Sequence, residues 1–433
     1  MRAAILSIGT ELTRGELVNS NATWLSERLT ALGFEVVEHA VVPDDSERIG
    51  ATVSRFGREV KLVLGTGGLG PTSDDLTADA VAAMLGVSVV RHEPSLERIR
   101  ARYRRIGREM PAPNVKQADL PAGADVLDND VGTAPGFAVQ VGEARCFFLP
   151  GVPREMRHLF EAHVVPEMAP QVPRTSHQVH IRSYGLRESE VAERLGDIDE
   201  GGTLARPGVT LGYRAHFPEI EVKVLARAVD EAAATALADE VAAQVRERLG
   251  DHAYGGRGDS YAAWVGERLR ARDWKLAVAE SCTGGLIGKL LTDPAGSSDY
   301  LVLDAVTYAN EAKQAVLGVD PEVLVEHGAV SAPVAQAMAE GALERAHADV
   351  AVATTGIAGP GGGSDHKPVG TVWFGLARRG AETLTECRQF SGDRERVRTA
   401  AAWNALRLVA RAAASSLDAL SGGALDDDKD RAK

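Results

Sequence analysis

The chain has 433 residues, 44% of them hydrophobic and 25% charged, with a formal net charge of -13, and its length predicts about three globular domains. Three cysteines without a C-x-x-C pair exclude a disulfide framework or an ordinary structural zinc site and suit a reducing cytoplasm. The acidic balance disfavours nucleic acid as a partner, and without a signal peptide or an apolar run of ~18 residues we expect a cytoplasmic protein with no membrane partner.

The sequence pattern of residues 1–170 predicts alternating strands and helices. This order predicts a parallel, doubly wound sheet, in which ligands bind at the carboxyl ends of the strands. The strands are expected at 3–8, 35–42 and 61–64, and the helices at 22–32 and 47–56.

A glycine-rich loop, G-T-G-G-L-G-P-T-S-D-D-L-T, follows the third of these strands at 65–77. Such a backbone can approach a phosphate closely. Asp74 and Asp75 could cap the next helix or hold Mg²⁺ against a pyrophosphate. Because the two aspartates directly follow the glycines, we predict a divalent-metal site. The candidate ligand-binding residues of this domain are Gly67, Gly68, Gly70, Glu11, Asn19 and Asn21.

Three motifs carry a resemblance to a known family: the glycine loop, V-P-D-D at 42–45 and L-P-G-V-P-R-E-M at 149–156. They resemble the molybdopterin-binding-like domain that opens the CinA family of competence/damage-inducible proteins. The resemblance implies a functional role for Asp75, the aspartate before L-T. It also implies metal-dependent ADP-ribose pyrophosphatase activity rather than molybdenum chemistry.

The most basic window of the chain lies at 91–108. It fits a solvated amphipathic helix with Leu96, Ile99, Tyr103 and Ile106 toward the core. The alternatives are that its arginines bind nucleic acid, form a dimer contact or contact a phosphate group of a ligand. We favour the solvated helix, because Tyr103 is the window's one aromatic residue on which a base could stack.

A proline-rich stretch at 166–173 is expected to be a linker, and a small α+β module is predicted at 174–252. The CinA resemblance implies a KH-like fold there. No G-x-x-G loop of the RNA-binding kind occurs in it, so we expect a scaffold or lid. Residues 255–259 are expected to be a second linker. Strands are predicted at 178–184, 209–215 and 219–226, and helices at 188–195 and 231–249.

A third α/β domain is predicted at 258–420, followed by a disordered tail at 421–433. Three strand ends are expected to converge on Ser281, Lys313 and a glycine loop at 355–364. Its strands are predicted at 276–279, 301–308 and 350–354, and its helices at 262–270, 286–291 and 333–345.

Chemistry in this domain is expected at A-E-S-C-T-G-G, residues 279–285. A serine hydroxyl needs a base, and a lysine whose pKa is lowered by burial can serve. Cys282 is the rival nucleophile. The amides of 282–285 are expected to stabilise an oxyanion and the glycine loop to cradle a phosphate. The substrate-binding candidates are Cys282, Thr283, Gly284, Gly285, Thr355, Gly356, Gly359, Gly361, Arg394 and Arg398, although a solvated helix face would explain the two arginines equally well.

These residues resemble the CinA C-terminal domain, which also occurs alone as an amidohydrolase. The resemblance implies conversion of nicotinamide mononucleotide to nicotinate mononucleotide and ammonia, with no cofactor. It also implies that Ser281 is the nucleophile and that Tyr308 and Lys313 lie beside it. A homodimer is expected from the family.

The sequence therefore predicts two hydrolytic sites in pyridine-nucleotide salvage. One acts on ADP-ribose with a divalent metal, Mg²⁺ or a similar ion, and the other acts on nicotinamide mononucleotide. Two alternatives stay open: a non-catalytic adaptor in DNA uptake or recombination, and a molybdopterin-handling protein.

Overall fold

The computed structural model describes residues 1–199 and 201–414. The tail predicted at 421–433 and the predicted end of the third domain lie outside the described residues. The chain divides into two compact units, Met1–Gln178 with Arg206–Thr210 and Leu225–Val241, and Val179–Ala205 with Leu211–Val224 and the chain from Ala242. Within the described residues, no helix has the length and apolar character needed to cross a membrane.

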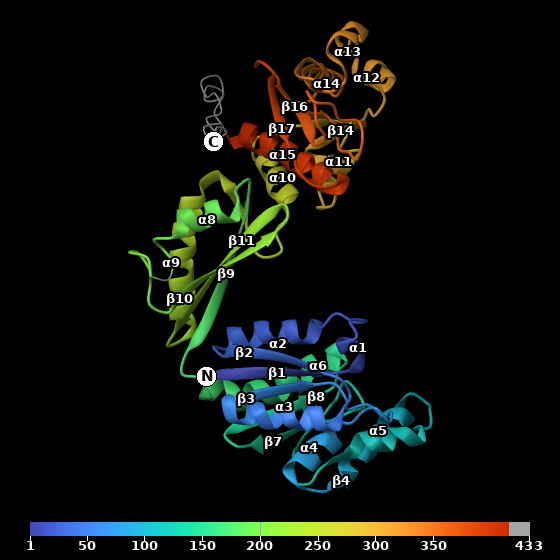
Figure 1. Ribbon diagram of the computed structural model, residues 1–433, viewed down its shortest axis with the longest axis vertical. Helices are drawn as coiled ribbons and strands as arrows, with labels where there is room; N and C mark the ends of the chain where they lie inside the picture. The colour runs from blue at the N-terminus through green and yellow to red at the C-terminus, as the bar shows by residue number, and fades with distance from the viewer. Residues whose placement is uncertain (200, 415–433) are drawn as a thin grey trace. The chain divides into compact units, whose positions relative to one another are not determined.

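The first part of the chain is built on a six-stranded sheet with the order β2-β1-β3-β8-β7-β6 (Figure 1). Its strands are β1 (Arg2–Ile8), β2 (Glu35–Val42), β3 (Leu62–Thr66), β6 (Asp125–Leu127), β7 (Gly136–Val141) and β8 (Ala144–Leu149), and β4 (Val89–Arg91) pairs separately with β5 (Asp119–Pro121). Its helices are α1 (Thr10–Thr13), α2 (Ser20–Ala31), α3 (Ser46–Glu59), α4 (Thr77–Leu85), α5 (Glu93–Arg105), α6 (Pro153–Leu159) and α7 (Val165–Met168).

Both faces of this sheet are covered, as the predicted doubly wound arrangement requires. Side chains alternate along β1, so Ala3 and Ile5 pack in one core with α2 and α6, whereas Ala4 and Leu6 pack in another with α3 and α4. Figure 1 shows α2 and α3 on opposite sides of the sheet. Strands buried on both faces need the near-continuous apolar sequence that β1 has.

The sheet is parallel only in part. β2, β1, β3 and β8 run parallel, but β7 pairs antiparallel with β8 and β6 antiparallel with β7. The expectation of a wholly parallel sheet is therefore wrong at one edge. The cause is a tight turn at Gly142, whose φ of 59° lets the chain reverse between β7 and β8.

The basic window forms α5. Leu96 and Ile99 are buried against Ala118, as predicted, but Ile106 is 58% exposed, because the helix ends at Arg105. Its arginines pair with groups of the same part of the chain: Arg91 with Asp119, Arg98 with Asp128, and Arg102 with the carbonyls of Asp130 and Val131. These contacts support the solvated helix over a nucleic-acid patch.

The proline-rich stretch expected to be a linker is helical. α7 begins at Val165 and a 3₁₀ turn follows at Ala169–Gln171, with a proline in the first turn of each. Proline is tolerated there because the first amides of a helix have no intrahelical acceptor. Met168 is 2% exposed, so this segment belongs to the core.

A four-stranded sheet of the order β10-β11-β9-β12 forms the middle of the chain. The helices form at the predicted residues, and the first three strands extend the predicted ones slightly. The third strand pair was not expected: β12 precedes the stretch predicted as a linker, shares only Gly255 with it, and pairs antiparallel with β9. The elements are β9 (Thr175–Tyr184), β10 (Val209–His216), β11 (Glu219–Ala228), β12 (Ala253–Gly255), α8 (Glu188–Leu195) and α9 (Glu231–Leu249).

The last sheet has five strands in the order β14-β13-β15-β16-β17. β13 runs parallel to β14 and β15, and β16 and β17 add an antiparallel edge that was not predicted. Its strands are β13 (Leu276–Glu280), β14 (Leu301–Val306), β15 (Val350–Gly356), β16 (Thr371–Arg378) and β17 (Leu384–Gln389). Its helices are α10 (Tyr261–Ala271), α11 (Leu286–Thr292), α12 (Asn310–Leu317), α13 (Pro321–His327), α14 (Ala332–Arg345) and α15 (Arg394–Ala414).

Side chains on β13 again divide between two cores. Leu276 and Val278 pack with α10, α11 and α15, whereas Ala277 and Ala279 pack with α14. The small alanines let α14 approach the sheet closely, and β13 is an interior strand, paired with β14 on one side and β15 on the other. The residue after β13 therefore lies at the carboxyl edge of a covered sheet, the usual place for a ligand.

Five aromatic side chains form a stack next to this domain. Tyr261 and Trp403 lie parallel, with ring centroids 4.9 Å apart and planes inclined by 3°. Tyr184 on β9 and Tyr254 on β12 pack against the same pair, and Trp264 stacks on Tyr261. The small β9–β12 pair thus shares a core with α10 and α15.

Candidate active sites

The first candidate site is the turn that follows β13. The amide of Ser281 donates to the carbonyl of Thr354 at 3.0 Å, which fixes the turn to β15. Gly284 and Gly285 follow with φ of 61° and 89°, in the left-handed region that favours glycine. The chain folds back over Ser281, which is 9% exposed.

Lys313 reaches Ser281 from α12. Its Nζ lies 3.1 Å from Ser281 Oγ and donates to the carbonyls of Thr307 and Tyr308 at 2.9 and 3.3 Å. Lys313 is 1% exposed, and this burial lowers the pKa of its ammonium group. A neutral amine here can donate to both carbonyls and accept the serine proton with its lone pair, as a general base must.

Cys282 lies beside this pair but has the wrong chemistry for a nucleophile. Burial raises the pKa of its thiol to about 12, so the thiol stays protonated near neutral pH. The reactive form of cysteine is the thiolate. The buried, protonated thiol is therefore a weaker candidate for a nucleophile than Ser281, whose Oγ contacts Lys313 Nζ.

The predicted oxyanion donors are only partly available. The amide of Gly284 donates to the carbonyl of Ser281 at 3.2 Å, and the amide of Gly285 donates to the carboxylate of Glu280 at 2.9 Å. The expectation that these two amides face an oxyanion is wrong, because the turn itself uses them. Of the other two residues, Cys282 lines the cavity over Ser281. Thr283 is fully buried, and its hydroxyl contacts Thr354 Oγ1 at 2.8 Å.

A cavity of about 280 Å³ opens over Ser281. Thr283, Gly284, Gly285 and Arg398 are not among its lining residues. The predicted residues that do line it are Ser281, Cys282, Tyr308, Lys313, Thr355, Gly356, Gly359, Gly361 and Arg394. The lining also includes Ile357, Ala358 and Gly362 of the predicted glycine loop, and three residues that were not predicted to bind substrate: Asn310, Ala329 and Val330.

Arg394 and Arg398 have different positions. Arg394 lines the cavity, donating to the carbonyl of Gly359 at 2.7 Å and to the hydroxyl of Tyr308 at 3.0 Å. Arg398 instead donates to the carbonyl of Thr283 at 2.8 Å from behind the serine turn. Arg394 therefore belongs to the cavity wall, whereas Arg398 supports the serine turn.

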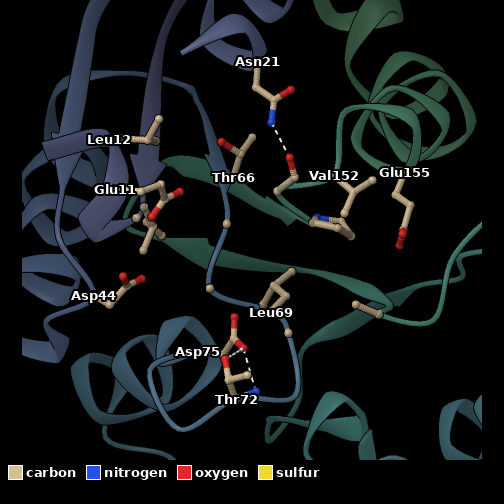
Figure 2. Close-up of a pocket in the computed structure, with 18 of the residues that line it drawn as sticks. Glu11, Leu12, Asn21, Asp44, Thr66, Leu69, Thr72, Asp75, Val152 and Glu155 are labelled. Carbon is tan, nitrogen blue, oxygen red and sulfur yellow. Dashed lines mark hydrogen bonds between the residues drawn. The ribbon is translucent and has the colours of Figure 1, made fainter. Parts of the chain in front are cut away.

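The second candidate site is a cavity of about 540 Å³ at the carboxyl ends of β1, β3 and β8. Its glycine loop is conformationally demanding: Gly67 has φ of 101°, and a Cβ there would lie 2.1 Å from the carbonyl oxygen of Ile8. Figure 2 shows the carboxylates of Glu11, Asp44 and Asp75 around this space. Predicted residues that line it are Glu11, Asn19, Asn21, Gly67, Gly68, Gly70, Asp74 and Asp75.

Neither Asp74 nor Asp75 caps the next helix. The N-cap of α4 is Leu76, which makes no side-chain capping bond. Asp75 Oδ2 instead accepts the amide of Thr72 at 2.8 Å, inside the loop (Figure 2). Asp74 is exposed, and a hydrogen bond from Thr72 lowers the pKa of its carboxyl. Both carboxylates therefore interact with Thr72 of the glycine loop, and both residues line the cavity.

The two asparagines differ in their hydrogen bonding. Asn19 caps α2 by accepting the amide of Ala22 at 3.1 Å and donates to Ser7 Oγ at 2.9 Å. Asn21 donates to the carbonyl of Gly151 at 2.7 Å, but its Oδ1 is buried with no protein partner. A buried acceptor without a donor is costly, so Asn21 is the residue of this pair suited to receive a ligand donor.

Two carboxylates of the cavity were not predicted. Asp44 accepts the backbone amide and the hydroxyl of Thr10, both at 2.8 Å, and Glu155 accepts the side-chain Nδ2 of Asn129 at 2.6 Å. Asp44 lies within the V-P-D-D motif, which could have identified it. In the described part of the chain, no three His, Cys, Asp or Glu side chains are grouped to hold a metal ion.

Three family models match the chain. They are the probable molybdopterin binding domain at 4–170, the damage-inducible protein CinA KH domain at 178–255 and the CinA C-terminal domain at 258–413. A CinA-like protein from Anaeromyxobacter dehalogenans is 43% identical over 414 residues, covering 94% of this chain and 99% of the relative. One from Geobacter sulfurreducens is 44% identical over 416 residues, 95% of this chain and 99% of the relative.

Solved structures resemble parts of the chain. Competence/damage inducible protein CihA from Agrobacterium tumefaciens is 42% identical over 36% of this chain and 94% of its own, with a TM-score of 0.35. The protein CinA from Thermoplasma acidophilum is 33% identical over 39% of this chain and 97% of its own, with a TM-score of 0.36.

Proposed function

The chain belongs to the CinA family, and from this premise and the geometry around Ser281 we propose that it hydrolyses nicotinamide mononucleotide to nicotinate mononucleotide and ammonia. The observation that supports this most is the 3.1 Å contact between the buried Lys313 amine and the Ser281 hydroxyl. A lysine whose pKa is lowered by burial is the base that a serine amidohydrolase without a histidine requires.

In the first half of the reaction, Lys313 accepts the proton of Ser281 as Oγ bonds to the carboxamide carbon. The amide of Cys282, which lines the cavity, donates to the oxyanion that forms. The carbon–nitrogen bond then breaks, and the departing nitrogen takes the proton from Lys313 and leaves as ammonia. The product is an ester between the nicotinate group and Ser281.

In the second half, Lys313 accepts a proton from water as the water oxygen attacks the ester carbon. The ester bond breaks, the proton returns to Ser281 Oγ, and nicotinate mononucleotide leaves. The substrate, water, Ser281 and Lys313 supply every proton and electron pair in these steps. We assign the substrate phosphate to Arg394 and the glycine loop at 355–364, an assignment supported by their presence in the cavity lining.

We propose a second activity, hydrolysis of the pyrophosphate bond of ADP-ribose, for the cavity of the first sheet. It is supported by five lining carboxylates, Glu11, Asp44, Asp74, Asp75 and Glu155, beside the glycine loop. The unpaired Oδ1 of Asn21 is an acceptor for a ribose hydroxyl or base amino group. Attack by water on a pyrophosphate builds up charge on oxygen, which needs cations nearby.

These residues fit a divalent cation whose coordination shell is completed by oxygen atoms of the substrate. Asp75 and Asp44 each have one carboxylate oxygen engaged by a threonine, at Thr72 and Thr10, and keep the other for a ligand. Mg²⁺ is commonly held by one or two carboxylates together with phosphate oxygens. When bound, it neutralises charge on those oxygens, while the loop amides orient the pyrophosphate.

The purified protein assayed on both nucleotides, with and without a divalent metal, tests these proposals together. We expect ammonia release from nicotinamide mononucleotide without added metal, and cleavage of ADP-ribose only with it. Retention of a pterin without pyrophosphatase activity would instead identify a molybdopterin-handling protein. If both activities were absent and the protein still bound a partner protein, it would be identified as an adaptor.

A further inference from the structure

Glu280, the last residue of β13, is fully buried immediately before Ser281. Its two carboxylate oxygens accept different amides of the following turn, Oε2 that of Gly285 and Oε1 that of Gly288, each at 2.9 Å. A buried carboxylate is costly unless such donors satisfy it. Glu280 therefore fixes the path of the chain on the far side of Ser281.

The main chain of Glu280 supports the lysine as well. Its carbonyl accepts the amide of Thr307 at 2.7 Å, and the carbonyl of Thr307 in turn accepts Lys313 Nζ at 2.9 Å. One residue thus connects the turn that carries the hydroxyl to the segment that holds the amine. A shift of Glu280 would move Ser281 Oγ and Lys313 Nζ relative to each other.

Asp304 on the edge strand β14 lies next to Glu280. The residue is exposed as a whole, but its carboxyl lies over Gly288, where a Cβ would come within 1.8 Å of Asp304 Oδ2. Burial of this carboxyl, the charge of Glu280 and a hydrogen bond between the two raise the pKa of Asp304 to about 7. In its protonated form, Asp304 donates that hydrogen bond to Glu280.

We propose that Glu280 is the positioning residue of the Ser281–Lys313 pair and that Asp304, when protonated, holds Glu280 in place. This inference rests on the proposed function of Ser281 and Lys313. It assigns no contact with substrate to either carboxyl group.

The arrangement makes the turn sensitive to pH. The other ionisable groups around it are Cys282 on the turn, Lys313 on α12 and Arg398 on α15. Because the pKa of Asp304 is raised in the folded chain, the contact is complete below about pH 7 and is lost as the pH rises through that value. Ionised Asp304 would then repel Glu280, and the turn would loosen.

Two isosteric variants, assayed for ammonia release across about pH 6 to about pH 9, test this inference. Glu280→Gln replaces one accepting oxygen with an NH₂ group that repels the facing glycine amide. We expect kcat to fall by about 10²-fold with KM nearly unchanged, because misplacement by ~1 Å costs that much. Asp304→Asn keeps a donor toward Glu280 at every pH, so its kcat should not fall above about pH 7, whereas that of the unaltered protein should.

Wild-type kcat for Glu280→Gln, or identical pH profiles for Asp304→Asn and the unaltered protein, would overturn the inference. Thermal unfolding of both variants separates loss of positioning from loss of folding, and if Glu280→Gln does not fold, the Asp304→Asn profile decides. Ser281→Ala separates a failure of the proposed function from a failure of the positioning role. If that variant stays active, the proposed function fails. If it is inactive while both carboxyl variants behave as wild type, only the positioning role fails.

Discussion

The two cavities differ in how complete their chemistry is before a ligand arrives. Around Ser281, the hydroxyl, the amine and the carbonyls that hold the amine are already in contact, and Lys313 is 1% exposed. In the cavity of the first sheet, the carboxylates are spread around the space, and Asn21 Oδ1 has no partner. The first site is organised by the fold, whereas the second, under the proposed function, would be completed by substrate and metal.

This difference predicts different responses to perturbation. Preorganised groups lower a barrier because they need not reorganise during the reaction, so removing one is costly. A site completed by its ligand depends instead on metal concentration and on several weak contacts. Variants of single residues should therefore affect the Ser281 site more strongly than the carboxylate site.

The largest effect is expected for Ser281→Ala, which should abolish ammonia release from nicotinamide mononucleotide. Neither Lys313 nor the oxyanion donors can replace the missing ester intermediate. Cys282→Ala is the matched control and should keep substantial activity, because the pKa of that thiol is raised to about 12. An inactive cysteine variant would transfer the nucleophilic role to the thiol.

Lys313→Met should slow ammonia release by ~10²–10⁴-fold, the usual contribution of a general base. Lys289→Met is the matched control, because Lys289 is exposed on α11 and pairs with Asp293. The rise of kcat with pH as Lys313 becomes neutral should be visible in Asp304→Asn, in which the opposing fall above about pH 7 is removed, and it should report a pKa below the usual lysine value of 10.5. A rate in Lys313→Met equal to that of the control would show that another group takes the serine proton.

Asp75→Asn should weaken metal-dependent cleavage of ADP-ribose by roughly 10–100-fold and raise the metal concentration needed, because the amide keeps the shape but loses the charge. A chelator should stop this activity and leave ammonia release unchanged. Asp79→Asn, at an exposed residue of α4 outside the cavity, is the control. Normal activity and metal dependence in Asp75→Asn would place the site elsewhere.

The smallest effect is expected for Arg394→Lys, which keeps the charge but loses the planar pair of donors to Gly359 and Tyr308. We expect KM for nicotinamide mononucleotide to rise about tenfold with little change in kcat. Arg396→Lys, on the same helical turn but stacked on Phe217, should leave KM unchanged. Equal KM values for both variants would argue against a substrate contact by Arg394.

Apolar runs predicted most of the fold. The strand at 276–279 and the helices at 188–195 and 231–249 form where their patterns indicate. Antiparallel edges were missed because the pairing of β7, β16 and β17 depends on turns and neighbours rather than on local periodicity. The prediction of a linker at 166–173 was wrong, because a proline is as common at the start of a helix as at a break in the chain.

The site was predictable only where residue type carries the chemistry. Ser281 and Lys313 were found from their motifs, and the structure brings them together. Thr307 was missed because it acts through its carbonyl, which every residue has. Gly284 and Gly285 were misassigned because nothing local to the glycines shows that Glu280 and Ser281 would accept their amides.

The aromatic stack has a consequence for how this part of the chain unfolds. Tyr184 and Tyr254 cover the rings of Tyr261 on α10 and Trp403 on α15. If the β9–β12 pair unfolded, these rings would be exposed to water. Exposing aromatic area of that size costs several kcal/mol. The β9–β12 pair and the last sheet should therefore melt as one cooperative body, with tryptophan fluorescence and loss of ammonia release sharing a single midpoint.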